Sequence, residues 1–134
     1  MFTPETRILV IDDMKVMRSL IKGQLRTLNY QNISEAENGE EAFKILEQNH
    51  SVNTPIQVVL SDWNMPVMSG LELLKKVRED ARFKNLPFIM ITAEGELEQV
   101  KSAAELGVSS YIRKPFAPNT FSEKLEQVYK KHCA

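Results

Sequence analysis

The sequence contains one cysteine and almost no net charge. Cys133 stands next to the last residue, so an internal disulfide is excluded and a reducing compartment is expected. The 17 Lys and Arg residues nearly balance the 18 Asp and Glu residues, leaving a formal net charge of −1 at pH 7. This balance indicates no nucleic acid or other polyanion as a partner.

Long hydrophobic runs are absent as well. The strongly apolar stretches, such as residues 8–11 and 58–60, are far too short to span a membrane. The first residues lack the apolar region of a signal peptide. A chain of 134 residues can bury a core without disulfides. We therefore expect one domain, residues 1–134, that is a monomer in the cytoplasm and binds no membrane.

The sequence instead alternates between strand-like and helix-like segments. Short runs rich in Val and Ile are followed by segments in which apolar residues recur at helical spacing. Five such units with short connections predict an α/β fold, a doubly wound parallel sheet with five helices. The expected strands are residues 7–11, 33–37, 56–61, 88–91 and 109–113.

Local signals refine this arrangement. Met14, Leu20 and Leu25 are expected on the inner face of the first helix. Ser69 is a candidate cap for the third helix. The polar residues 48–55 are expected to form the longest irregular connection.

Four of the expected strands end in polar residues of different chemistry. The first is followed by Asp12 and Asp13, and the third runs into Asp62. Thr92 ends the fourth strand, and Lys114 follows the fifth. Because the carboxyl ends of parallel strands meet at one edge of the sheet, these side chains are expected to share one crevice.

This combination of side chains suits phosphoryl transfer. Two carboxylates about 5 Å apart repel by roughly 3 kcal/mol at an effective dielectric near 20, so either their pKa values rise or a cation lies among them. Oxygen ligands open to water suit Mg²⁺. A carboxylate can accept a phosphoryl group, while an ammonium and a hydroxyl bind its oxygens. Asp62 is the natural acceptor, and Asp12 and Asp13 are better placed to hold the metal.

Each residue also has a simpler interpretation. Asp13 can serve as the cap of the first helix, and Thr92 can be a strand end or a cap. Lys114 alone is typical of a solvated surface lysine. The occurrence of all these residues at strand ends, in this order, favours the shared site.

The motifs at these strand ends resemble the receiver domain of bacterial two-component response regulators, most of all the stand-alone chemotaxis regulators of the CheY type. The resemblance covers essentially the whole chain, and it implies a flavodoxin-like sheet of order 2-1-3-4-5. The matching motifs are Asp12-Asp13, Asp62-Trp63-Asn64-Met65-Pro66, Ser69-Gly70, Thr92-Ala93-Glu94 and residues 110–116.

The resemblance implies a role for each site residue. Asp62 would receive phosphate from a histidine kinase. Mg²⁺ would be held by Asp13, by Asp62 and by the main-chain carbonyl of Asn64, with Asp12 acting through water. Lys114 would pair with the phosphate, and its bond to the following proline would be cis. The chain would be no enzyme beyond its own phosphorylation and dephosphorylation.

The resemblance also implies a switch and a partner surface. Thr92 would move toward the phosphate and Tyr111 would swing inward. These movements would remodel the fourth helix, fifth strand and fifth helix for binding to the flagellar motor switch. The candidate residues of this surface are Glu96, Leu97, Val100, Lys101, Arg113 and Lys124.

The sequence departs from the chemotaxis pattern at three places. Glu96-Leu97 stands where a lysine pair is usual, Arg113 replaces an apolar residue, and residues 48–57 form a longer segment than the norm. The first departure puts motor binding in doubt. A receiver that serves another output protein, or that acts as a phosphate sink, therefore remains an alternative.

Three other classes of function fit the sequence less well. An aspartyl-nucleophile phosphohydrolase wants a second acid where this chain has Asn64. A flavin carrier of the same fold needs a phosphate-binding loop after the first strand, where the acidic pair Asp12-Asp13 repels phosphate. A receiver that serves only as a scaffold would not need the full set of phosphorylation residues.

Overall fold

The structure is a computed structural model that describes residues 2–92, 97–114 and 116–132, with the side chains of residues 97–100 left undescribed. Five strands alternate with five helices in these residues. The strands are β1 (Arg7–Ile11), β2 (Asn32–Ala36), β3 (Val58–Asp62), β4 (Phe88–Thr92) and β5 (Ser110–Arg113). The helices are α1 (Lys15–Thr27), α2 (Gly39–Ser51), α3 (Gly70–Glu79), α4 (Leu97–Glu105) and α5 (Pro118–His132).

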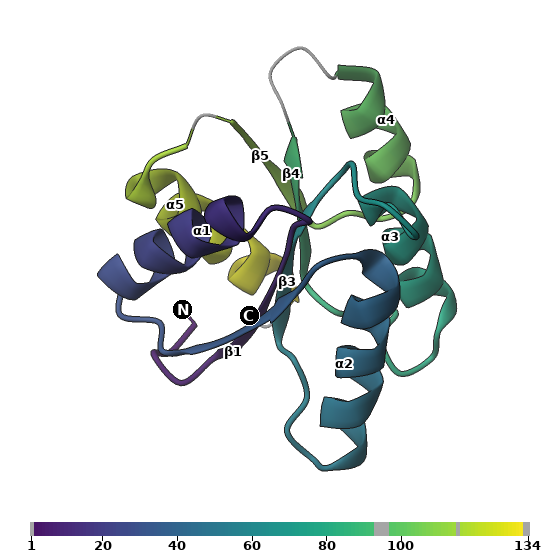
Figure 1. The fold of residues 1–134 in the computed structure, drawn as a ribbon, viewed down its shortest axis with the longest axis horizontal. Coiled ribbons are helices and arrows are strands. Elements are labelled where there is room, and N and C mark those ends of the chain that lie inside the picture. Colours follow the sequence, from purple (N-terminus) through teal and green to yellow (C-terminus); the bar gives the residue numbers. More distant parts are fainter. Residues whose placement is uncertain (1, 93–96, 115, 133–134) are drawn as a thin grey trace.

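The strands form one parallel sheet in the order β2-β1-β3-β4-β5. Helices α1 and α5 cover one face, and α2, α3 and α4 cover the other (Figure 1). The doubly wound, flavodoxin-like fold is therefore confirmed. The inner strands β1, β3 and β4 are almost wholly buried because both of their faces are covered, which explains their continuous apolar runs.

Two apolar cores lie on the two faces of the sheet. Alternate residues of each inner strand point to opposite faces, so Leu9 and Val59 pack under α2 and α3, while Val10 and Leu60 pack under α1 and α5. The edge strand β2 is only half-buried, as its weak apolar pattern indicates. The ends of β1 and β3 thus lie at the centre of the sheet, which is buried on both faces.

The ends of the helices have identifiable causes. Ser69 caps α3 in a capping box with Glu72, as the sequence predicts. Gly107 follows α4 with a φ of 85°, a left-handed conformation that glycine adopts without steric cost. Asp13 does not cap α1, because the N-cap position is Met14 and the helix has no side-chain cap. The interpretation of Asp13 as a capping residue is therefore wrong.

The segment after α2 also differs from the expectation. Helix α2 continues to Ser51, so only residues 52–57 connect it to β3. Asn49 donates its side-chain amide to the carbonyl of Ile45, and Ser51 donates its hydroxyl to that of Glu47. These polar side chains bond to the preceding turn of α2, so the polar composition of residues 48–51 did not predict where the helix ends.

No helix in the described part of the chain combines the length and the apolar character that crossing a membrane requires.

Candidate functional site

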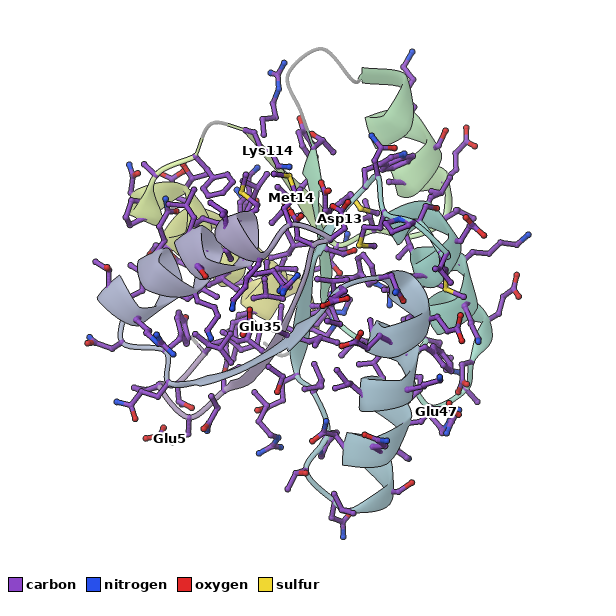
Figure 2. All side chains as sticks on the ribbon, viewed as in Figure 1. Glu5, Asp13, Met14, Glu35, Glu47 and Lys114 are labelled. Atoms are coloured by element: carbon purple, nitrogen blue, oxygen red, sulfur yellow. The ribbon has the colours of Figure 1, made fainter. Side chains whose placement is uncertain are left out.

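The predicted site residues converge at the carboxyl edge of the sheet. Ile11 pairs with Ser61 across β1 and β3, so Asp12 and Asp62 follow on neighbouring strands. Thr92 is the last residue of β4 and pairs with Arg113 of β5. Figure 2 shows Asp13 and Lys114 at this same end of the sheet, approaching it from β1 and β5. Register along the sheet thus brings distant parts of the sequence into one site.

Three carboxylates form the centre of the site. Asp12, Asp13 and Asp62 each offer an oxygen, and these oxygens lie within 4.8 Å of one another. Asp12 is 1% exposed, Asp62 is partly buried and Asp13 is exposed. Because three like charges at this spacing repel one another, the cluster favours either raised pKa values or a cation among the carboxylates.

Asp12 is the most perturbed member of this group. Its Oδ1 accepts a hydrogen bond of 2.9 Å from the backbone amide of Met14, whereas its Oδ2 is buried with no hydrogen-bond partner among the described residues. Burial, reinforced by the charges of Asp62 and Asp13, raises the pKa of Asp12 to about 6 against the opposing effect of the Met14 amide. A buried carboxylate oxygen without a donor is a position that a metal ion or its bound water can fill.

Asp62 has a cationic partner. Nζ of Lys114 lies 3.2 Å from Oδ1 of Asp62, and both side chains are partly buried. Burial raises the pKa of Asp62, although the ammonium of Lys114 acts in the opposite direction. The backbone of Lys114 is fixed as well, since its amide donates to the carbonyl of Thr92 at 2.8 Å. The lysine thus stands beside the carboxylate expected to react.

Thr92 and Tyr111, the predicted switch residues, occupy neighbouring strands. Thr92 is 2% exposed at the end of β4, and Tyr111 is half-buried on β5 against the core beneath α2, α3 and α4. Nζ of Lys124, on α5, lies 5.2 Å from the centre of the Tyr111 ring. This distance is typical of a cation–π contact.

The candidate partner surface is described only in part. Lys101 and Arg113 are exposed, and Lys124 lies over Tyr111. Asn64, the predicted carbonyl ligand, is exposed in the loop after β3. The other residues predicted for this region, Glu96 and the side chains of Leu97 and Val100, lie outside the described residues, as does the predicted cis bond from Lys114 to Pro115.

Arg18 contributes to the site although the sequence reasoning did not single it out. Its Nη1 donates to the main-chain carbonyl of Asp12 at 2.7 Å, and its Nε donates to Glu35 at 3.1 Å. Lys22 binds the other oxygen of Glu35 at 2.9 Å. The signal was available in the helical period, because Arg18 shares the buried stripe of α1 with Ile21 and Leu25.

Two residues that were expected on the inner face of α1 lie outside this buried stripe. Met14 and Leu20 are 58% and 49% exposed, so they lie outside the inner face of α1. An arginine occupies the inward position nearest the site, where it binds the carbonyl of Asp12. A hydrogen-bond donor for the carbonyl of Asp12 therefore lies on the inner face of α1, although apolar residues are otherwise preferred there.

Comparison with known proteins agrees with this geometry. The family model described as the response regulator receiver domain matches residues 8–126. The chain is 48% identical to the chemotaxis protein CheY1 of Helicobacter pylori over 122 residues, which are 91% of this chain and 95% of that protein. It is 45% identical to the chemotaxis protein CheY homolog of Campylobacter jejuni over 122 residues, 91% of each chain.

A solved structure is similar along nearly the full length. The chemotaxis response regulator CheY4 of Vibrio cholerae matches with a TM-score of 0.78 at 30% identity, covering 92% of this chain and 98% of that one. The sequence matches and the order of the strands thus indicate the same family. The chain belongs to the response regulator receiver domain family and is a receiver of the CheY type.

Proposed function

We propose that this chain is a phosphate-accepting response regulator of bacterial chemotaxis and that Asp62 is its acceptor. The observation that carries this role is the position of Asp62. It ends the central strand β3, shares a cluster with two other carboxylates and lies 3.2 Å from Nζ of Lys114. The relatives named as chemotaxis proteins support the biological setting.

The donor set fits Mg²⁺. The cluster offers only oxygen atoms, one of them the buried and unpartnered Oδ2 of Asp12, and hard oxygen ligands are those that Mg²⁺ prefers. Asp12, Asp13 and Asp62 would hold the ion, together with the main-chain carbonyl of Asn64. When bound, it would neutralise the carboxylates and the phosphoryl oxygens at once.

The chain's own residues would carry out the transfer by positioning and charge pairing. A carboxylate oxygen of Asp62 attacks the phosphorus of a kinase phosphohistidine. The new O–P bond forms as the N–P bond breaks, and the histidine nitrogen leaves with the electron pair. The product is an acyl phosphate on Asp62. Lys114, already within 3.2 Å of Asp62, then binds a phosphoryl oxygen, and the hydroxyl of Thr92 donates to another.

The phosphoryl group would act on the partner surface through Thr92 and Tyr111. These residues lie on adjacent strands, and Tyr111 contacts Lys124 of α5. A movement of Thr92 toward the phosphate would leave space into which Tyr111 turns, changing the surface formed by α4, β5 and α5. We take residues 1–134 to act as one monomeric domain in the cytoplasm, with no catalytic activity on other molecules.

The partner we propose is a peptide of the flagellar motor switch. Glu96-Leu97 favours a second candidate, because an acid and an apolar residue stand where a lysine pair is usual. Loss of positive charge would weaken the binding of an acidic peptide by about 1 kcal/mol or more. A different output protein, or a phosphate-sink role, follows if the motor peptide does not bind.

Two measurements test these roles. The protein is incubated with a small acyl phosphate with and without Mg²⁺, and Asp62→Asn serves as the control. We expect Mg²⁺-dependent incorporation of phosphate into the wild type and none into the variant. A switch-protein peptide is then titrated against beryllofluoride-activated protein. The motor assignment is wrong if activation gives no gain in affinity and Glu96→Lys with Leu97→Lys restores none.

A further inference from the structure

The loop between β3 and α3 contains a strained turn beside the site. Val67 has a φ of 68°, a left-handed conformation that β-branched residues rarely adopt. The amide of Met68 donates to the carbonyl of Pro66 at 2.7 Å, so residues 66–68 form a γ-turn of the rare type with positive φ. The Val67 side chain is 73% exposed, and its burial therefore does little to offset this strain.

The tip of the loop is fastened to α2. The amide of Gly39, the first residue of α2, donates to the carbonyl of Met68 at 3.1 Å. A Cβ on Gly39 would lie 2.8 Å from Cγ and 2.9 Å from the carbonyl oxygen of Met68, so only glycine allows this approach. In Figure 1 the loop between β3 and α3 correspondingly lies beside the start of α2.

The base of the loop is fastened to β3. The amide of Gly70 donates to the carbonyl of Trp63 at 2.9 Å, and a Cβ on Gly70 would collide with the carbonyl oxygen of Asp62. Asn64 lies between these two attachments, two residues after Asp62. The backbone that offers the expected carbonyl ligand is thus held at the base by Gly70 and at the tip by Gly39.

We propose that Val67 and Gly39 are positioning residues for cation binding, which they serve by fixing the loop that carries Asn64. The strained turn persists because the bond from Gly39 and the contacts of Gly70 hold the loop on both sides. Pre-organisation of the carbonyl avoids the loss of chain entropy that a free loop would suffer on binding the ion. This role rests on the proposed function, since it assumes a cation at the acidic cluster.

Three variants separate the strain from the positioning. Val67→Asn introduces a residue that tolerates the left-handed conformation, so it should raise the melting temperature of metal-free protein by a few degrees. Val67→Gly relieves the strain but frees the turn, and Gly39→Ala displaces Met68. Both should weaken Mg²⁺ binding by roughly tenfold, the effect typical of losing an outer support of a metal site.

The experiment measures the Kd for Mg²⁺ from Trp63 fluorescence, together with the melting temperature and the hydrogen exchange of the Gly39 amide without metal. Gly23→Ala is the matched control, because a Cβ there has no neighbour within 4 Å. Weaker Mg²⁺ binding and faster Gly39 exchange in Val67→Gly, with an unchanged control, support the positioning role.

Val67→Gly and Gly39→Ala with the affinity and exchange of the wild type would overturn it. If Gly39→Ala does not fold, Val67→Gly decides alone. A wild-type protein that binds no Mg²⁺ instead refutes the proposed function itself, and with it the need for positioning.

Discussion

Neutralising Asp12 is expected to stabilise the metal-free protein in a manner that depends on pH. The carboxyl is 1% exposed, and its pKa is raised from 3.8 to about 6. Below about pH 4 it is protonated in both the folded and the unfolded states and imposes no penalty. Between about pH 4 and pH 6 the folded state binds more protons than the unfolded state, so stability falls as the pH rises.

The size of this penalty follows from the shift. A difference of about two pKa units corresponds to about 3 kcal/mol, fully present above pH 6. Asp12→Asn removes the charge and keeps the shape, and its amide can donate to a neighbouring carboxylate. We therefore expect the variant to be more stable than the wild type by about 1–3 kcal/mol at pH 7.5 and by little at pH 4.

Urea unfolding in the presence of a chelator at both pH values measures the difference. Asp13→Asn is the matched control, because Asp13 belongs to the same cluster but is exposed. Solvent screens its charge, so its gain should stay below about 1 kcal/mol. Adding Mg²⁺ should stabilise the wild type and have much less effect on Asp12→Asn. An equal gain at both pH values, or no gain at pH 7.5, would refute the clustered-charge explanation.

Three further predictions concern the neighbours of the acidic cluster. Lys114→Ala should still be phosphorylated slowly by a small acyl phosphate but should gain no affinity for the partner, because the ammonium 3.2 Å from Asp62 is lost. Labelling measures the phosphorylation and peptide titration measures the affinity, and a normal gain in affinity on activation would contradict the prediction. Trp63, which is 9% exposed and follows Asp62, should change its fluorescence with Mg²⁺ and again with beryllofluoride; a signal that responds to neither argues against a metal site here. Arg18→Met should destabilise the fold by about 2–3 kcal/mol, because it leaves the carbonyl of Asp12 and one oxygen of Glu35 without their donor. If the variant unfolds at the same denaturant concentration as the wild type, the contacts of Arg18 contribute little to stability.

The sequence was sufficient to predict where the site lies. Short apolar runs in an alternating α/β pattern predict parallel strands, and parallel strands bring their carboxyl ends together. Asp12, Asp62 and Thr92 could therefore be placed at one edge from their positions after such runs, and the structure brings them there. Their roles in phosphorylation and metal binding stay predictions.

The remaining features depend on contacts that no local pattern contains. The helical period places Arg18 on the buried stripe of α1, but it does not predict its partners, which are the carbonyl of Asp12 and the carboxylate of Glu35 on a different strand. Residues 48–51 look like a loop in composition, yet they remain helical, and the side chains of Asn49 and Ser51 bond to carbonyls one turn earlier in α2. Val67 adopts a conformation that its residue type disfavours, since attachments on both sides of the loop outweigh local preference.

The most direct test of the central claim is to locate the phosphoryl group on the protein. After reaction with an acyl phosphate and Mg²⁺, borohydride reduction converts an aspartyl phosphate to homoserine, which peptide mass spectrometry can assign to one residue. We expect homoserine at Asp62 alone, with none when Mg²⁺ is withheld or in Asp62→Asn. Homoserine at Asp12 or Asp13, or phosphate retained by Asp62→Asn, would contradict the assignment of Asp62 as the acceptor.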